Sequence, residues 1–250
     1  MIRKILAILW LIILIVTPSA NAHELEGSYL YKVTTIRAER GNFSDLLDWI
    51  SELRASNYFT DAGKQAPFIM RHSQGDQWDL LVITPMGSWA DYYSKAATKK
   101  RAKAAQTYAG QLKEGYGFVA FEEDIFAYGP PLDDVKEAFE SNSFYHIEMF
   151  EAGAGKTDEL FEQRRMENKY LKLTGQKENM IFSRAGGSDV DIFTIGFHSD
   201  FETFVTQGTA TPEEKEAAAK ASGFKDRADL SFYLRSLITG HNDTFAGKVD

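Results

Sequence analysis

Five polar side chains between positions 146 and 168 could perform chemistry together. His146 and Glu148 alternate along an expected strand, so both point to the same face. Arg164, Glu167 and Asn168 share one face of an expected helix. A histidine can act as a general base near neutral pH, a carboxylate can orient it, and a guanidinium can hold an anionic group. We therefore take His146, Glu148 and Arg164 as candidate catalytic residues, and Glu167 and Asn168 as candidate ligand-binding residues.

The same residues also fit a purely structural interpretation. Arg164 and Glu167 are three residues apart, a spacing at which a helix forms ion pairs. His146 would then be a core or rim histidine whose hydrogen bonds are satisfied. Structural ion pairs perturb ionisable groups as active sites do, so composition leaves both interpretations open. The deciding observation is whether His146, Glu148 and Arg164 converge on a pocket that reaches solvent.

Aromatic residues of the first half offer a second kind of site. Trp78 and Trp89 are candidate ligand-binding residues, because large rings at such spacings can line an apolar cavity. The alternative is ordinary core packing, in which large aromatic side chains also dominate.

No sequence motif for a metal or cofactor is recognisable. There is no H-E-x-x-H pair, P-loop, G-x-G-x-x-G or G-x-S-x-G, and no two histidines have helical spacing. We therefore predict no cofactor and no metal site. One weak exception is His23, which as a new N-terminus could chelate copper through its amine and ring. The five histidines are His23, His72, His146, His198 and His241.

The elements that must position these candidates follow a pattern that occurs twice. A strand, an amphipathic helix, two strands joined by a glycine-containing hairpin, a helical region and a closing strand begin near Tyr31 and again near Tyr145. This order predicts an α+β fold made of two tandem ferredoxin-like β-α-β-β-α-β repeats, residues 23–130 and 131–250. We expect strands at 29–37, 67–73, 78–84, 117–128, 144–150, 179–184, 190–197 and 244–249. We expect a helix from 43 to 53, a short helix after Ser88, a longer helix to about Lys113, and helices after Gly155, after Thr211 and from 227 to 238.

Aligning the two repeats shows where they differ. Arg71 and Asp79 of the first repeat align with Arg184 and Asp191 of the second, which suggests a shared structural pairing. At the positions that align with the candidate site of the second repeat, the first repeat has uncharged or differently charged residues. These pairs are Lys32 and His146, Thr34 and Glu148, Ile50 and Arg164, and Leu53 and Glu167.

The duplicated order resembles the dimeric α/β-barrel superfamily in its tandem, single-chain form. The segments 122–131 (EEDIFAYGPP) and 240–244 (GHNDT) look like those of an uncharacterised bacterial exported family within it. The resemblance implies that the two repeats pack sheet to sheet as a barrel. It implies no single activity, because the superfamily includes monooxygenases, haem-degrading enzymes and chlorite dismutases.

The N-terminus reads as a secretory signal peptide over residues 1–22. Arg3 and Lys4 precede an apolar run from Ile5 to Val16, and A-x-A ends at Ala22. The run is too short for a membrane span. We expect cleavage after Ala22 and a periplasmic or secreted protein. The chain has no cysteine and a net charge of −8, which disfavours nucleic acid and anionic membranes as partners. It could be a monomer or a homo-oligomer.

Three functions remain for comparison. We predict an exported barrel that binds a small molecule, with an apolar or aromatic ligand. The alternative is a cofactor-independent monooxygenase-like or isomerase-like enzyme with its site in the second repeat. The third is a protein of the periplasm that has no ligand.

Overall fold

The computed structural model describes residues 27–206 and 208–249. The predictions of a signal peptide and of a copper ligand at His23 lie outside the described residues. The described chain is α+β, with eight strands and ten helices. The strands are β1 (Tyr29–Ala38), β2 (Phe68–Gln74), β3 (Leu80–Gly87), β4 (Val119–Gly129), β5 (Phe144–Ala152), β6 (Met180–Gly187), β7 (Ile192–His198) and β8 (Ile238–Lys248). The helices are α1 (Phe43–Ala55), α2 (Tyr58–Asp61), α3 (Trp89–Tyr92), α4 (Lys95–Thr107), α5 (Ala109–Tyr116), α6 (Leu132–Ser141), α7 (Thr157–Leu173), α8 (Phe201–Val205), α9 (Pro212–Ser222) and α10 (Asp229–Leu237).

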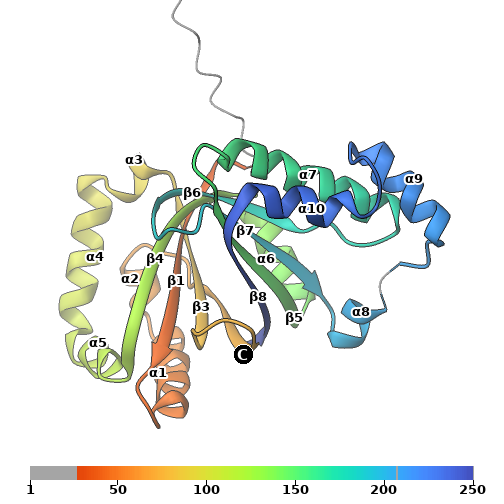
Figure 1. Cartoon of the computed structure of the whole chain (residues 1–250). Helices are drawn as coiled ribbons and strands as arrows, with labels where there is room; N and C mark the ends of the chain where they lie inside the picture. The colour runs from red at the N-terminus through yellow and green to blue at the C-terminus, as the bar shows by residue number, and fades with distance from the viewer. Residues whose placement is uncertain (1–26, 207, 250) are drawn as a thin grey trace, which may run out of the picture.

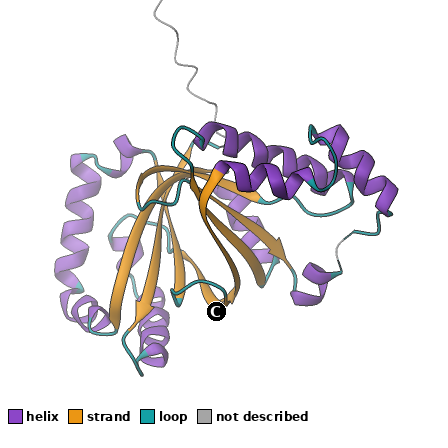
Figure 2. Cartoon of the chain, viewed as in Figure 1, coloured by secondary structure: helices purple, strands orange, loops and turns teal. Residues whose placement is uncertain are grey.

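The eight strands form one closed antiparallel barrel in the order β1-β3-β2-β8-β5-β7-β6-β4. The first four strands are neighbours in the order β4-β1-β3-β2, and the last four in the matching order β8-β5-β7-β6. Two pairings, β2 with β8 and β4 with β6, join the halves and leave no free sheet edge. Figure 2 shows the strands at the centre of the molecule and most helices outside them.

Glycines allow the hairpin of each half to approach the other half. Gly75 follows β2 with a φ of +123°, and Gly187 ends β6 with a φ of +98°. A Cβ atom at Gly75 would lie 2.0 Å from the carbonyl oxygen of Asp243, and one at Gly187 would lie 2.2 Å from that of Asp124. Any larger residue at either position would therefore clash with the neighbouring strand and strain the turn.

The interior of the barrel is a packed core. Alternate residues point inward, so Tyr31 and Val33 of β1 meet Phe182 and Phe193 across the barrel. The segment that joins the halves folds into α6 and closes one end. The ring of Phe139 in this helix stacks on Tyr145, with ring centroids 5.2 Å apart. Helix α6 therefore closes the interior of the barrel at this end.

The outer face of the sheet is covered by helices that differ between the halves. Leu46 and Ile50 of α1 pack on Ile69 and Leu80 of the first half. In the second half, α7 and α10 lie side by side across the sheet (Figure 1). Their buried apolar residues form a cluster with the outward side chains of the strands, namely Phe150, Leu160, Phe161, Ile181, Ile192, Leu234 and Leu237.

Two expected helices have different limits in the structure. The helix expected to reach Lys113 is divided into α4 and α5 at Tyr108, whose hydroxyl donates to Asp61 and whose ring packs against Tyr58. The C-terminal helix ends at Leu237, and β8 starts at Ile238 instead of Thr244. The reason is tertiary, because β5 extends to Ala152 and pairs with Ile238 there.

The alignment of Arg71 with Arg184 is wrong by one residue. His72 and Arg184 occupy equivalent positions, because their N–H groups donate to the carbonyls of Asp79 and Asp191 at 2.9 and 2.8 Å. Asp79 and Asp191 are equivalent as expected, since each carboxylate accepts from the end of its half's first strand at 2.8 Å. Among described residues, only the second half completes an arginine–aspartate ion pair here, between Arg184 and Asp191.

We predict that Phe193→Ala lowers the free energy of unfolding by about 3–5 kcal/mol, because it empties a filled position in the barrel core. The ring is 1 % exposed and stacks on Phe182 at 4.6 Å. Phe232→Ala is the control, since that side chain is 71 % exposed. Its effect should stay within about 0.5 kcal/mol. Urea unfolding measures both, and similar losses for the two variants would contradict a packed interior.

Candidate functional site

A charged cluster lies between α7 and the outer face of β5 and β8. His146 and Glu148 point away from the barrel, because their neighbours Tyr145 and Ile147 fill its interior. Arg164 reaches them from α7 and is 2 % exposed. The structure thus brings together the three residues that the sequence singled out.

Arg164 is the centre of a dense hydrogen-bond network. Its Nε donates to Gln163 at 2.7 Å, its Nη1 lies 3.5 Å from Glu148, and its Nη2 donates to Glu167. The guanidinium also lies 4.6 Å from the ring centre of Phe150. A buried guanidinium with this many partners is held in one orientation.

Two further residues of the cluster come from β8. Asp243 accepts from His146 at 2.7 Å, and His241 lies 3.6 Å from Glu148. We missed both as site residues because we started the last strand at Thr244. The available signal was the alternation of His241 and Asp243, which places both on one face once β8 is extended.

The environment shifts the pKa of several groups in the cluster. Burial tends to raise the pKa of Glu148, but nearby His241 and Arg164 outweigh it and hold that pKa at about 2. Burial raises the pKa of Glu167, and Arg164 offsets this only in part. Burial lowers the pKa of His146, yet the hydrogen bond to Asp243 and the nearby charges of Glu148, Asp243 and Glu167 together outweigh it, and the net shift is upward. Glu148 is therefore the ionised partner of Arg164.

Asn168 and Trp89 take part in packing. The side chain of Asn168 donates to the carbonyl of Asn179 at 2.7 Å and accepts from its N–H at 2.8 Å, which anchors α7 to the start of β6. Trp89 packs on Phe126 with ring centroids 5.0 Å apart. Both contacts are structural, and neither residue lines the two cavities described next.

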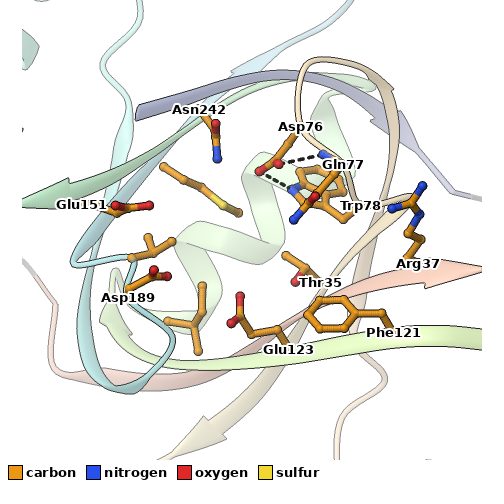
Figure 3. A pocket seen from close by; sticks show the side chains of 13 residues that line it. Thr35, Arg37, Asp76, Gln77, Trp78, Phe121, Glu123, Glu151, Asp189 and Asn242 are labelled. Atoms are coloured by element: carbon orange, nitrogen blue, oxygen red, sulfur yellow. Dashed lines mark hydrogen bonds between the residues drawn. The ribbon is translucent and has the colours of Figure 1, made fainter. Parts of the chain in front are cut away.

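The larger cavity opens at the barrel end opposite α6 and has a volume of about 530 Å³ (Figure 3). Trp78, the remaining candidate ligand-binding residue, forms part of its wall. The wall combines residues from both halves, namely Thr35, Arg37, Asp76, Gln77, Trp78, Phe121, Glu123, Ile125, Met149, Glu151, Asp189, Val190 and Asn242. We call this cavity the barrel mouth.

Negative charge dominates the barrel mouth. The residues that line it include four carboxylates, those of Asp76, Glu123, Glu151 and Asp189, and one guanidinium, that of Arg37. Within the described part of the chain, none of these five residues forms an ion pair. Figure 3 shows the carboxylates on different walls around an open centre. Such a site attracts a positive charge.

A second cavity of about 220 Å³ lies between the sheet and the helices of the first half. Its wall includes Ile50 and Leu53, the residues that the sequence alignment of the halves pairs with Arg164 and Glu167. Its wall is mostly apolar, with Trp49, Tyr58, Phe59 and Tyr116 among the rings. Neither cavity has His146, Glu148 or Arg164 in its wall.

The two cavities offer no histidine to a haem group. Histidine is a common axial ligand of haem iron, and the walls of these two cavities contain none. His146 is engaged with Asp243, and His241 stacks on Phe150 with ring centroids 4.7 Å apart.

Comparison with solved structures identifies the architecture. An anthrone oxidase-like protein superposes with a TM-score of 0.56 at 10 % identity, covering 90 % of this chain and 93 % of its own. A monooxygenase-like protein from Fusobacterium nucleatum has a TM-score of 0.50 at 9 % identity, with 89 % and 93 % covered. The chain has the dimeric α/β-barrel fold. At these identities the likeness extends to the fold alone.

Other comparisons add little to this result. A chlorite dismutase from Candidatus Nitrospira defluvii has a TM-score of 0.49 at 11 % identity, with 92 % of this chain and 95 % of the other covered. No family model matches the sequence, and no curated protein matches it. In the described residues, no helix has the length and apolar character needed to cross a membrane.

We predict that Arg164→Met destabilises the protein by about 3–5 kcal/mol, because it leaves Glu148 and Glu167 buried without their cation. The adjacent Arg165 is the control, since its side chain is 47 % exposed and its ion pair with Glu162 lies at the surface. Arg165→Met should cost less than about 1 kcal/mol. Chemical denaturation at pH 7 compares them, and equal losses would show that burial of Arg164 has no special consequence.

We also predict a loss of stability in acid that depends on His198. Burial lowers the pKa of this residue to about 4, and nearby Lys177 and His146 act in the same direction. The unfolded chain, with a pKa near 6.5, then binds the proton more readily. The stability that comes from keeping His198 neutral is fully present above pH 6.5. It is lost as the pH falls toward 4, because protons then bind the unfolded chain preferentially. Unfolding free energies should be about 1–2 kcal/mol lower at pH 5 than at pH 7 through this group. His198→Leu should reduce that difference, and an unchanged difference would contradict the assignment.

Proposed function

We propose that the protein binds a small molecule in the barrel mouth, and that this ligand joins a cationic group to an aromatic or apolar part. The observation that carries the proposal is a cavity of about 530 Å³ whose wall contains four carboxylates and a single guanidinium. This volume lies within the range of ordinary ligand sites.

The apolar side of the mouth supports the second half of the proposal. Trp78, Phe121, Met149 and Val190 offer rings and aliphatic surface to a ligand. Asp76 holds the Trp78 indole in place by accepting from Nε1 at 3.0 Å. A cation beside an aromatic face gains electrostatic attraction in addition to contact area. The expectation of an aromatic or apolar ligand is thus retained and extended by a positive charge.

An organic cation fits the mouth better than a metal ion. A metal ion needs several donor atoms that converge within a few ångströms. Among the described residues, the group that meets this condition lies at Glu148, His241 and Asp243, and it includes no carboxylate of the mouth. The spread of charge over several walls suits a larger ligand.

We expect benzyltrimethylammonium to bind the mouth and phenylacetate to fail. The two probes have similar rings and opposite charges. Tryptophan fluorescence and calorimetry report binding at low ionic strength, because exposed charges are screened by salt. Asp189→Asn and Glu151→Gln should each weaken binding of the cation about threefold to tenfold. Trp78→Val, which introduces the apolar side chain that Val190 provides in the second half, should also weaken binding of benzyltrimethylammonium, because it removes the aromatic face from the mouth.

Three controls make this test decisive. Glu122 lies next to Glu123 in β4 but is not part of the wall of the mouth. Glu122→Gln should therefore leave binding of benzyltrimethylammonium unchanged. Equal binding of the two probes would refute the preference for a cation. Unchanged affinity in Asp189→Asn and Glu151→Gln would place the ligand elsewhere.

The enzyme alternative rests on the convergence of His146, Glu148 and Arg164. Their geometry suits proton transfer, since Asp243 holds the imidazole at 2.7 Å. The groups nevertheless fill their space with one another, and neither cavity reaches them. We therefore place ligand binding ahead of catalysis.

Two sequence predictions complete the proposal. We propose export after cleavage following Ala22, which N-terminal sequencing of the protein from its own host would test. We also propose that the halves arose from a duplicated unit. The matching strand order and the equivalent hydrogen bonds of Asp79 and Asp191 support this origin.

A further inference from the structure

We propose that Glu148, His241 and Asp243 bind one divalent transition-metal ion on the outer face of β5 and β8. One ligand atom from each residue lies within 4.8 Å of the others. Two carboxylates and an imidazole are common ligands of such ions. This site is separate from the barrel mouth, because the side chains of neighbouring residues on a strand point to opposite faces. Asn242, between His241 and Asp243, points into the mouth.

The distances within the group suit a shared ion better than direct hydrogen bonds. His241 Nε2 lies 3.6 Å from Glu148 Oε1 and 3.7 Å from Asp243 Oδ2. Both distances are too long for hydrogen bonds. Two ligands at about 2.1 Å from a tetrahedral ion lie about 3.4 Å apart. Shifts of a few tenths of an ångström would therefore bring His241 to this spacing from each carboxylate.

Neighbouring groups already orient the two carboxylates. Glu148 uses its other oxygen, Oε2, to accept from Thr194 at 3.1 Å and from Arg164 at 3.5 Å. Asp243 uses its other oxygen, Oδ1, to accept from His146 at 2.7 Å. Each carboxylate thus keeps one oxygen toward His241. Partners of this kind fix ligand orientation in metal sites.

The first half shows what stands at the equivalent position. The pairing of β1 with β4 places Asp124 opposite Thr34, as the pairing of β5 with β8 places Asp243 opposite Glu148. The ammonium of Lys32 lies 3.0 Å from Asp124 and supplies a positive charge there. In the second half His146 replaces this lysine, Glu148 and Glu167 add two carboxylates, and Arg164 adds one positive charge. Three carboxylates then stand against one guanidinium, and a metal ion would supply further positive charge.

An ion could reach the proposed site from solvent. The side chain of Asp243 is 56 % exposed and that of His241 is 27 % exposed, whereas Glu148 is 11 % exposed. The group is thus open on the β8 side and closed on the side of α7. Water molecules could complete the coordination of the ion at the open side.

Calorimetric titration of the chelator-treated protein with Zn²⁺ tests the proposal, and the absorption spectrum of added Co²⁺ reports the ligands. We expect one ion per chain with a micromolar or tighter Kd. His241→Ala and Asp243→Asn should each weaken binding at least about tenfold. Asp124→Asn, the matched change in the first half, should leave the Kd unchanged. Asp243→Asn changes an exposed side chain, so it is expected to fold even if His241→Ala does not.

Three results would overturn the proposal. The first is no saturation by Zn²⁺ or Co²⁺ at micromolar concentrations. The second is an unchanged Kd in folded Asp243→Asn. The third is binding that survives His241→Ala and Asp243→Asn but disappears in His23→Ala, which would place the ion at the N-terminus.

Discussion

Closure of the barrel through the β2–β8 and β4–β6 pairings is the constraint on which the rest of the structure depends. Each half alone would be a four-stranded sheet with two open edges and an uncovered apolar face. Pairing edge to edge removes the open edges and buries that face in one interior. Gly75 and Gly187 make these contacts possible, because each lets a hairpin approach an aspartate of the other half.

Closure also separates two chemical environments along the same strands. Inward residues form the apolar core and, toward the open end, the acidic mouth. Outward residues meet the helices. Strand β8 shows the principle within three residues, since His241 and Asp243 face outward while Asn242 faces the mouth. Helix α6 completes the arrangement by closing the other end with Val135 and Phe139.

The two halves have the same strand order but different side chains between helix and sheet. In the first, Ile50 and Leu53 leave an apolar cavity between helix and sheet. In the second, Arg164 and Glu167 stand at the aligned positions and bury charge against Glu148. Buried ion pairs contribute little net stability and are costly to break, so this cluster is a constraint on the second half more than a source of stability.

The sequence by itself determined the α+β class, the strand order of each half and the charged group around His146, Glu148 and Arg164. Hydrophobic periodicity and turn residues are local signals, so helices and strands can be predicted from a single sequence. Only the tertiary structure decided the rest. The start of β8 at Ile238, which brings His241 and Asp243 to Glu148, depends on pairing with β5. The mouth, assembled from turns and strands of both halves, arises from barrel closure, and contacts between distant segments leave no periodic trace in the sequence.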